Sequence, residues 1–328
     1  MLSVNERRQR MDVSLQGVEE AAVHLNGIVL RTPLLSFADL NTTCGTTVHL
    51  KCENMQHGGA FKLRGATNAV RLLTASEKAR GVATHSSGNH AQALARAAYR
   101  AGIRAYVVMP STTRRLKVEA VKRFGGQITF CEPTEEARTK GVEEVIAETG
   151  ALLVHPFEDP RVICGQGTVA LEIMSDFSSS DCVIVPIGGG GLISGCATVI
   201  KALHARTRVI GVEPSGADSA RRSLEANTRI IHPGPKGIAD GLLASVGERT
   251  FSLIRTLVDE VVVVDDEEIV QAMKLLWIHA KLVVEPAGAA PVAALIGGKV
   301  RAANAVAVLS GGNIACPWSL QDGALWPE

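Results

Sequence analysis

The 328-residue chain has few aromatic residues, almost no net charge and no long apolar run. Aromatic residues make up 4% of the sequence, and 34 Lys and Arg residues are balanced by 33 Asp and Glu residues. This balance excludes a general attraction to nucleic acid or to an anionic membrane. Because no stretch of about 18 apolar residues occurs and the N-terminus is charged, neither a membrane span nor a signal peptide is expected. We therefore expect a cytoplasmic protein whose partner is a small molecule.

The seven cysteines and nine histidines lack the spacings of known frameworks. The cysteines are scattered, odd in number and without a CxxC pair, which argues against a disulfide framework and against a zinc ribbon. The histidines form no HExxH or similarly spaced pair, so the sequence does not support a transition-metal site. We interpret the cysteines mostly as buried thiols.

Glycine is abundant, with 32 residues, and short β-branched segments alternate with amphipathic ones. The patterns predict, among others, helices over residues 63–73, 165–174 and 267–281 and strands over residues 182–187 and 305–309. Short strands bracketing helices of about three turns are typical of parallel sheets with helical crossovers. Two such series, separated near Pro156 without a flexible linker, predict two closely packed α/β blocks with a cleft between them.

The stretch from Cys52 to Ala66 places a lysine in an unusual setting. Lys62 follows the Gly58-Gly59 pair and Phe61, at a point where backbone and ligand can approach closely. A partly desolvated lysine can lose its proton near neutral pH and form a Schiff base with an aldehyde. The alternative is an ordinary loop lysine between a strand and a helix.

A run of four glycines, residues 188–191, connects an apolar strand to a helix. Successive backbone N–H groups at a helix N-terminus suit a phosphate. No Gly-Lys-Ser/Thr follows, which excludes a Walker loop. A dinucleotide site with Glu213 in the ribose role and a simple tight turn both stay open as alternatives.

Two further turns carry hydroxyl groups. The SSGNH segment, residues 86–90, can hold a carboxylate at a helix N-terminus, and one of its serines can move a proton; the alternative is a serine N-cap beside a packing histidine. Ser310 follows the last apolar strand, at the edge where ligands bind in open α/β sheets. Its hydroxyl can hydrogen-bond an unprotonated ring nitrogen, or it simply lies in a closing turn.

A lysine, a carboxylate pocket, a phosphate loop and a hydroxyl for a ring nitrogen match the polar parts of pyridoxal phosphate and its amino-acid adduct. The chain resembles the fold-type II pyridoxal-phosphate enzymes, and within them the serine/threonine dehydratase and serine racemase group. The resemblance covers nearly the whole chain and rests, in the family's order, on GAFKLRGA, THSSGNHAQAL, GQGT, VPIGGGGLISG, GVEPSGADS, IADGL, EPAGA and LSGGN.

The resemblance implies an α/β fold like that of tryptophan synthase β, with two open, twisted, mostly parallel sheets flanked by helices. The active site would lie in the cleft between a large cofactor-binding domain, residues 1–75 with 159–328, and a small domain, residues 76–158. It also implies a homodimer. The chain ends soon after LSGGN, so we do not expect the C-terminal regulatory domain of the biosynthetic threonine dehydratases.

The resemblance also assigns roles by position. Lys62 would be the Schiff-base lysine, Phe61 would pack beside the ring, Asn89 would bond the ring hydroxyl and Ser310 would face the pyridine nitrogen. The phosphate would be held by Gly188, Gly189, Gly190, Gly191 and Leu192. The substrate carboxylate pocket would be lined by Ser86, Ser87 and His90. Ser87 also occupies the position of the racemase serine that acts on the face opposite the lysine.

Several positions differ from the family or leave its implications open. The usual Thr-Gly-Ser before the phenylalanine is Gly58-Gly59-Ala60, so activation by ATP is not expected. Glu213 and the carbonyl of Ala217 match the family's divalent-cation site, but Ser219 replaces its acidic ligand, so Mg²⁺ or Ca²⁺ should bind more weakly. Arg138 occupies a position that faces a second substrate carboxylate in the racemase; the alternative is a solvated helix arginine.

The reaction implied is that of a pyridoxal-phosphate-dependent ammonia-lyase. Lys62 would remove the α-proton of a 3-hydroxy amino acid, such as L-serine, L-threonine or 3-hydroxyaspartate, and loss of the β-hydroxyl would lead to a 2-oxo acid and ammonia. The second enzymatic interpretation is a serine racemase with side dehydratase activity, in which Ser87 returns the proton. The non-enzymatic alternative is a ligand-binding regulator on the same scaffold.

Overall fold

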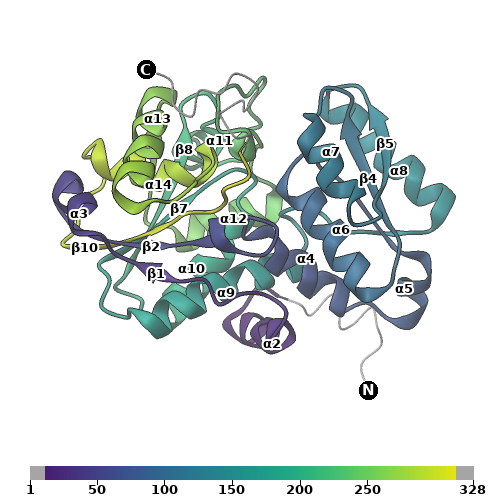
Figure 1. Cartoon of the computed structure of the whole chain (residues 1–328), viewed down its shortest axis with the longest axis horizontal. Coiled ribbons are helices and arrows are strands. Elements are labelled where there is room, and N and C mark those ends of the chain that lie inside the picture. Colours follow the sequence, from purple (N-terminus) through teal and green to yellow (C-terminus); the bar gives the residue numbers. More distant parts are fainter. Residues whose placement is uncertain (1–11, 315–328) are drawn as a thin grey trace, which may run out of the picture.

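A computed structural model describes residues 12–314 and contains two separate β-sheets (Figure 1). The larger has six strands in the order β1-β2-β10-β7-β8-β9, and the smaller has four in the order β5-β4-β3-β6. All neighbouring strands run parallel except β1 and β2. The predicted α/β fold with mostly parallel sheets is therefore confirmed.

The strands of the larger sheet are β1 (Leu34–Leu35), β2 (Thr47–Lys51), β7 (Cys182–Pro186), β8 (Arg208–Pro214), β9 (Glu260–Val264) and β10 (Asn304–Val308). Those of the smaller sheet are β3 (Val82–His85), β4 (Ala105–Pro110), β5 (Gln127–Cys131) and β6 (Leu152–Leu153). The strands of the smaller sheet all fall within the segment predicted as the small domain; the domain boundaries themselves stay a prediction.

The helices of the larger part are α2 (Leu15–Leu25), α3 (Ala38–Cys44), α4 (Lys62–Arg71), α9 (Pro160–Asp176), α10 (Gly191–Leu203), α11 (Ser219–Glu225), α12 (Glu248–Leu257), α13 (Asp266–Leu275) and α14 (Pro286–Ile296). The smaller part contains α5 (Ala75–Arg80), α6 (Asn89–Ala101), α7 (Arg115–Lys122) and α8 (Glu135–Thr149). Short turns η1 (Glu53–Met55), η2 (Asp240–Leu242) and η3 (Leu276–Ala280) complete the described elements.

The larger sheet is covered on both faces, which explains why its central strands are continuous apolar runs. All five residues of β7, CVIVP, are buried. One core cluster joins the sheet to α13 and α14, and another joins its other face to α2, α9, α10 and α12. Helix α4 lies between the two parts and packs against α6 of the smaller one and α9 of the larger one (Figure 1).

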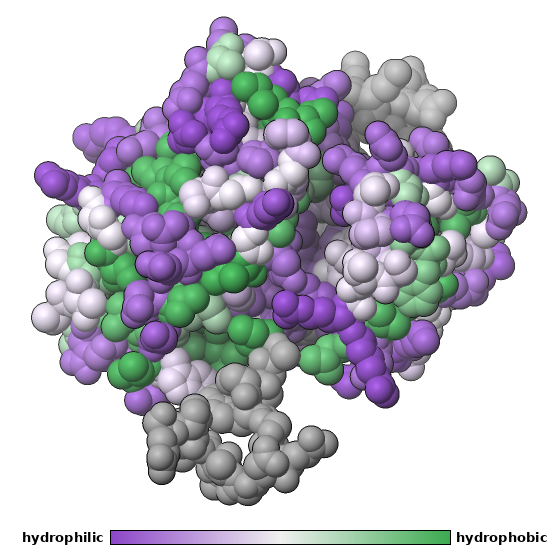
Figure 2. Space-filling model, turned by 90° about the horizontal axis from the view of Figure 1, so that it is seen from above, coloured by the Kyte–Doolittle hydropathy of each residue, from purple (hydrophilic) through white to green (hydrophobic). Residues whose placement is uncertain are grey.

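The strand order brings the predicted site segments together. β2, β10 and β7 are neighbours, and the Lys62 loop, Ser310 and Gly188 follow their carboxyl ends. In the smaller sheet, the segment from Ser86 follows β3, and Pro156 comes shortly after its neighbour β6. The carboxyl ends of parallel strands meet at one edge, which is where open α/β sheets bind ligands. Seen from above, the surface is hollowed between the two parts (Figure 2).

Two helix boundaries differ by five or more residues from the sequence prediction. Helix α9 begins at Pro160, five residues before the predicted start, because Asp159 caps it by accepting a hydrogen bond from the Arg161 N–H and proline suits the first turn. The helix predicted over residues 267–281 ends at Leu275, and one π-helical turn follows before Lys281 adopts a φ of 57°. Across residues 12–314, every helix is too short or too polar to span a bilayer.

Candidate active site

The loop that carries Lys62 needs the glycines that precede it. Gly58 and Gly59 have φ angles of 81° and 73°, which are left-handed values that favour glycine. A Cβ on Gly59 would also lie 2.3 Å from the Asn313 side-chain oxygen. The Phe61 N–H donates to the Ser310 carbonyl (3.1 Å), so this loop is tied to the end of β10.

Lys62 is the first residue of α4, and it is half-buried with its ammonium turned toward a backbone carbonyl. Nζ donates to the Pro156 carbonyl (2.9 Å) and lies 5.1 Å from the centroid of the Phe61 ring. Burial lowers the pKa of Lys62 from 10.5 to about 8, because no carboxylate offsets the loss of hydration. A sizeable fraction of the amine is therefore neutral near physiological pH, as a nucleophile or base requires.

The four glycines lead into α10, which begins at Gly191, and they lie close to the segment that accepts the Lys62 hydrogen bond. Gly190 has a φ of 88°, and a Cβ on Gly189 would lie 2.2 Å from the Phe157 ring. Phe157 directly follows Pro156, so the segment that accepts the Lys62 hydrogen bond also contacts the tetraglycine turn. N–H groups in the first turn of a helix have no carbonyl one turn earlier to bond and remain available to an anion.

Ser310 lies at the end of β10, beside the Lys62 loop. The residue is 3% exposed, and its hydroxyl makes no hydrogen bond to any residue between 12 and 314. A hydroxyl can both donate and accept, so this group is available to a ligand atom that accepts or donates a hydrogen bond.

Asn89 is held by two residues that the site prediction did not include. Its amide Nδ2 donates to Glu285 Oε1 (2.7 Å), and its Oδ1 accepts from Asn313 Nδ2 (2.8 Å). Asn313 Nδ2 also donates to the Gly58 carbonyl (2.8 Å). Since the amide nitrogen of Asn89 has a second hydrogen, it can still donate to a ring hydroxyl.

Glu285 is a buried carboxyl group inside this site. Burial, followed by the nearby charge of Asp240, raises its pKa to about 7, although the Asn89 hydrogen bond opposes the shift. The sequence prediction of the site does not include the side chains of Glu285 and Asn313. Both residues lie in motifs of the resemblance, Glu285 in EPAGA and Asn313 in LSGGN, but their burial and contacts depend on segments far apart in the chain.

The SSGNH segment lies at the N-terminus of α6, with Ser86 and Ser87 half-buried. Ser86 Oγ accepts a hydrogen bond from the Gly88 N–H (3.3 Å). His90 is buried, its Nε2 lies 3.1 Å from the Val154 carbonyl, and its Nδ1 has no partner among the described residues. Burial, with the nearby Lys62 charge, holds the pKa of His90 well below 6.5, so it stays neutral.

Arg138 lies on α8 in the smaller part and is half-buried. Its Nε donates to the Thr134 carbonyl (3.3 Å), and it forms no ion pair with any described carboxylate. Arg138 lies close enough to His85 to add to the lowering of that histidine's pKa, which is caused mainly by burial. The role of Arg138 toward a second carboxylate stays a prediction.

The predicted cation site contains one acidic residue. Glu213 accepts hydrogen bonds from the Ala220 and Arg221 N–H groups (both 2.8 Å), and burial raises its pKa to about 7. The Ser219 hydroxyl oxygen accepts a hydrogen bond from the Val246 N–H (3.2 Å). Within residues 12–314, no three His, Cys, Asp or Glu side chains are grouped to hold a metal. These residues therefore suit a divalent cation poorly, because such an ion favours several anionic oxygens.

A surface cavity of about 640 Å³ lies away from these residues. It is lined by residues 178–181 and 203–208, next to the amino ends of β7 and β8. Those ends are at the opposite edge of the sheet from the tetraglycine turn. The cavity is therefore not part of the candidate active site.

The residues present fit pyridoxal phosphate. Lys62 offers an amine for the aldehyde, the first turn of α10 offers N–H groups for the phosphate, and Ser310 offers a hydroxyl without a partner for the ring nitrogen. Asn89 has one free amide hydrogen for the ring hydroxyl. These four groups come from neighbouring segments at one edge of the two sheets.

Comparisons with known proteins point the same way. Residues 25–311 match the family model described as "Pyridoxal-phosphate dependent enzyme". The chain is 42% identical to serine racemase of Arabidopsis thaliana, covering 97% of each chain, and 45% identical to beta-hydroxyaspartate dehydratase of Paracoccus denitrificans, covering 89% of this chain and 94% of that protein. It superimposes on the structure of maize serine racemase with a TM-score of 0.90 and 41% identity, covering 92% of this chain and 94% of that one. The chain therefore belongs to the family of pyridoxal-phosphate-dependent enzymes, and its cofactor is pyridoxal phosphate.

Proposed function

We propose that this enzyme is an ammonia-lyase that converts a 3-hydroxy amino acid to a 2-oxo acid and ammonia. The observation that carries the proposal is the buried amine of Lys62, with a pKa of about 8, between the tetraglycine turn and the SSGNH segment. When bound, pyridoxal phosphate stabilises negative charge at the substrate's α-carbon. Lys62 is placed to take up the α-proton. The β-hydroxyl would then leave with a proton as water, and hydrolysis of the released enamine would give the 2-oxo acid and ammonia.

The other residues of the site bind and orient the cofactor and the substrate. The N-terminus of α10 would hold the phosphate of the cofactor, Ser310 would bond the ring nitrogen, and Phe61 would pack beside the ring. Asn89 would donate to the ring hydroxyl, and hydrogen bonds with Glu285 and Asn313 hold it in place. Ser86 and Ser87 receive the substrate carboxylate at the N-terminus of α6, where the helix dipole favours a negative charge.

Arg138 favours 3-hydroxyaspartate within this substrate class. It is a half-buried cation without a carboxylate partner among residues 12–314, and it lies near His85 on the smaller part. A second carboxylate on the substrate would supply that partner. The 45% identity to a beta-hydroxyaspartate dehydratase supports the same choice.

Racemisation of serine is the second candidate activity, and Ser87 favours it. Its hydroxyl lies in the smaller part, whereas Lys62 belongs to the larger one, so the two groups can act on opposite faces of a substrate in the cleft. The similarity to serine racemases supports this candidate.

Two measurements test the function. Lys62→Ala is expected to remove the visible absorbance of the lysine-bound cofactor and to abolish activity, whereas a binding protein that does not use this lysine would keep its absorbance. Purified enzyme is then incubated with L-serine, L-threonine and the 3-hydroxyaspartate isomers, and 2-oxo acid and D-amino acid are assayed together. A product consisting only of D-amino acid would refute the lyase and support the racemase.

The assembly and location of the enzyme are also part of the proposal. We propose a cytoplasmic homodimer with a large domain formed by residues 1–75 and 159–328. Ile278 and Val283 are 54% and 48% exposed on adjacent segments of the larger part, which supports burial against a second copy. Sedimentation of the purified protein tests the dimer.

A further inference from the structure

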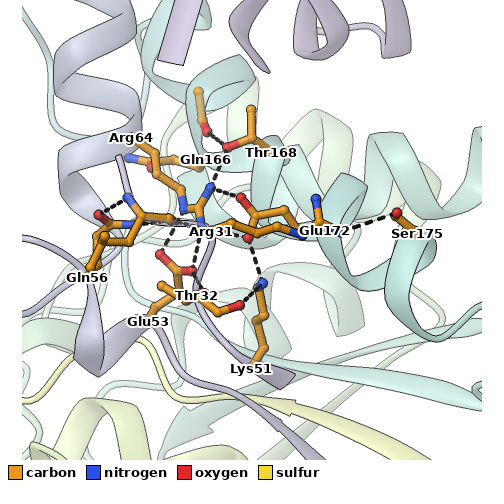
Figure 3. A network of polar contacts seen from close by, with 12 residues as sticks. Arg31, Thr32, Lys51, Glu53, Gln56, Arg64, Gln166, Thr168, Glu172 and Ser175 are labelled. Atoms are coloured by element: carbon orange, nitrogen blue, oxygen red, sulfur yellow. Dashed lines mark hydrogen bonds and ion pairs between the residues drawn. The ribbon is translucent and has the colours of Figure 1, made fainter. Parts of the chain in front are cut away.

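Four charged side chains, three buried and one partly buried, lie beside the Lys62 loop, and we call them the charge quartet (Figure 3). They are Lys51 at the end of β2, Glu53 in η1, Arg64 in α4 and Glu172 in α9. The side chains of Lys51, Glu53 and Arg64 are at most 1% exposed, and that of Glu172 is 13% exposed. Two cations face two carboxylates, so the quartet has no net charge.

Arg64 is bound by a carboxylate on each of two sides. Its guanidinium donates to both oxygens of Glu53 (2.8 and 2.7 Å) and to both oxygens of Glu172 (2.6 and 2.9 Å). It also donates to Thr168 Oγ1 (3.2 Å). Paired hydrogen bonds of this kind fix the plane of a guanidinium as well as its position. Arg64 is two residues from Lys62, in the same helical turn.

Glu172 connects the helix to the sheet. The oxygen that accepts from Arg64 Nη2 also accepts from Lys51 Nζ (2.6 Å). Lys51 Nζ donates in addition to the Thr32 carbonyl (2.7 Å), and the Thr32 hydroxyl donates to Glu53 (2.5 Å). The network therefore joins β2, η1, α4 and α9 in one closed set of contacts.

The quartet holds both ends of the loop that carries the catalytic lysine. Lys51 and Glu53 lie at the start of the loop and Arg64 lies just after its end, so the Glu53–Arg64 pair closes its base. The Gln56 side chain binds both the N–H and the carbonyl of Leu30 (2.9 Å each), and Arg64 reaches the same carbonyl (3.3 Å).

Stability alone does not explain such a group. Burying four charges costs much of what their attraction returns, and apolar side chains of similar size often stabilise a fold as well or better. Although burial favours the neutral acid, Arg64 and Thr32 bring the pKa of Glu53 below its ordinary value, so the carboxylate stays charged. A fixed and charged set of this kind is suited to defining one geometry.

We propose that Glu172 and Lys51 are positioning residues, which act through Arg64 to fix the first turn of α4 so that the Lys62 amine stays at the Pro156 carbonyl, away from water. The inference rests on the proposed function only in taking Lys62 as the reacting amine. Without the Arg64–Glu172 ion pair, the first turn of α4 is free to move, and the Lys62 amine regains hydration.

The test is a double variant, Lys51→Met with Glu172→Gln, which removes one charge of each sign and keeps the side chains similar in size. The full-length protein is freed of cofactor, and Lys62 acylation is followed by peptide mass spectrometry across pH. The wild-type midpoint is expected near pH 8. In the double variant it should rise by about one unit or more, toward that of a hydrated lysine. His90 and His155, which face Lys62, stay neutral in both proteins.

A second readout is turnover of the cofactor-loaded enzyme. A displaced base should lower kcat about 10- to 100-fold, with a much smaller change in KM. Glu172→Gln alone leaves a buried cation unneutralised and should lower the unfolding temperature, and adding Lys51→Met should restore it. If the double variant regains the wild-type kcat and Lys62 midpoint together with the wild-type unfolding temperature, the quartet is only structural and the proposal is overturned.

Two more variants keep the result unambiguous. Glu172→Asp retains the charge but shortens the side chain by one methylene, so it should shift the Lys62 midpoint in the same direction by less; an unchanged midpoint in this folded variant also overturns the proposal. Asp176→Asn is the matched control, since it removes the exposed partner of Arg31 one turn later on α9 and should leave the midpoint at the wild-type value. Because the labelling needs no turnover, it tests the role of the quartet even if the enzyme proves not to be a dehydratase.

Discussion

At the scale of single residues, the site is defined by buried groups that lack a close opposite charge. Burial lowers the pKa of Lys62 and raises the pKa of Glu285, in each case because the neutral form needs less hydration. The sequence predicted Lys62 from its glycine and aromatic neighbours. It did not single out Glu285, because the burial of a carboxyl group depends on segments far away in the chain.

Glu285 should make stability depend on pH. Its pKa is about 7 in the folded protein against an ordinary value of 4.5, so between these values the folded state holds a proton that the unfolded state releases. The free energy of unfolding therefore falls as pH rises through this window, by about 3 kcal/mol for this group. Glu285→Gln should remove that part of the fall while keeping an acceptor for Asn89, as measured by urea unfolding at pH 4.5 and 7.5.

Glu213 is a second source of pH-dependent stability, because burial raises its pKa to about 7 as well. In the Glu285 variant the contribution of Glu213 should remain, so the pH dependence shrinks without disappearing. An identical pH dependence in the variant and the wild type would show that Glu285 is already ionised in the folded protein.

At the scale of elements, the N-terminus of α10 depends on close contact with the segment after β6. A Cβ on Gly189 would lie 2.2 to 2.4 Å from three atoms of the Phe157 ring. The sequence predicted a phosphate loop from the four glycines, but it did not reveal that an aromatic side chain presses against one of them. Likewise, the early start of α9 depended on Asp159 and Pro160, whereas the prediction followed the apolar pattern after Gly165.

Gly189→Ala should therefore damage both folding and cofactor binding. Overpacking of this kind costs about 1 to 3 kcal/mol, and moving the turn should weaken binding of pyridoxal phosphate. Thermal unfolding and cofactor titration measure the two effects. Gly234→Ala is the control, since a Cβ there has nothing within 4 Å and should change neither quantity. Adding Phe157→Ala to Gly189→Ala should restore part of the affinity; no recovery would mean that the ring is not the obstacle.

At the scale of the whole molecule, an ion pair joins the smaller part to the larger one. Lys117 on α7 lies 2.5 Å from Asp240 in η2, and their side chains are 23% and 45% exposed. Such a pair contributes at most about 1 kcal/mol to stability. Because it connects the two sides of the hollow between the parts, its effect should fall on substrate binding.

Lys117→Gln should raise KM several-fold and change the unfolding temperature little, because the cleft closes less readily without the pair. Added salt should raise KM in the wild type and have less effect in the variant, since screening weakens an exposed pair. Arg115→Gln, which breaks an ion pair with Glu119 within α7, is the control and should leave KM unchanged. Equal KM values for the Lys117 variant and the wild type would exclude a role of the pair in closure.

The sequence by itself determined the alternation of strands and helices, the glycine turns and the lysine, because these depend on local pattern and backbone freedom. Parallel strands then had to bring their carboxyl ends to one edge. Only the tertiary structure decided that Glu285 would be buried against Asn89, and that Arg64 and Glu172 would meet beneath the Lys62 loop. Burial and charge pairing across distant segments arise from packing, which no local pattern encodes.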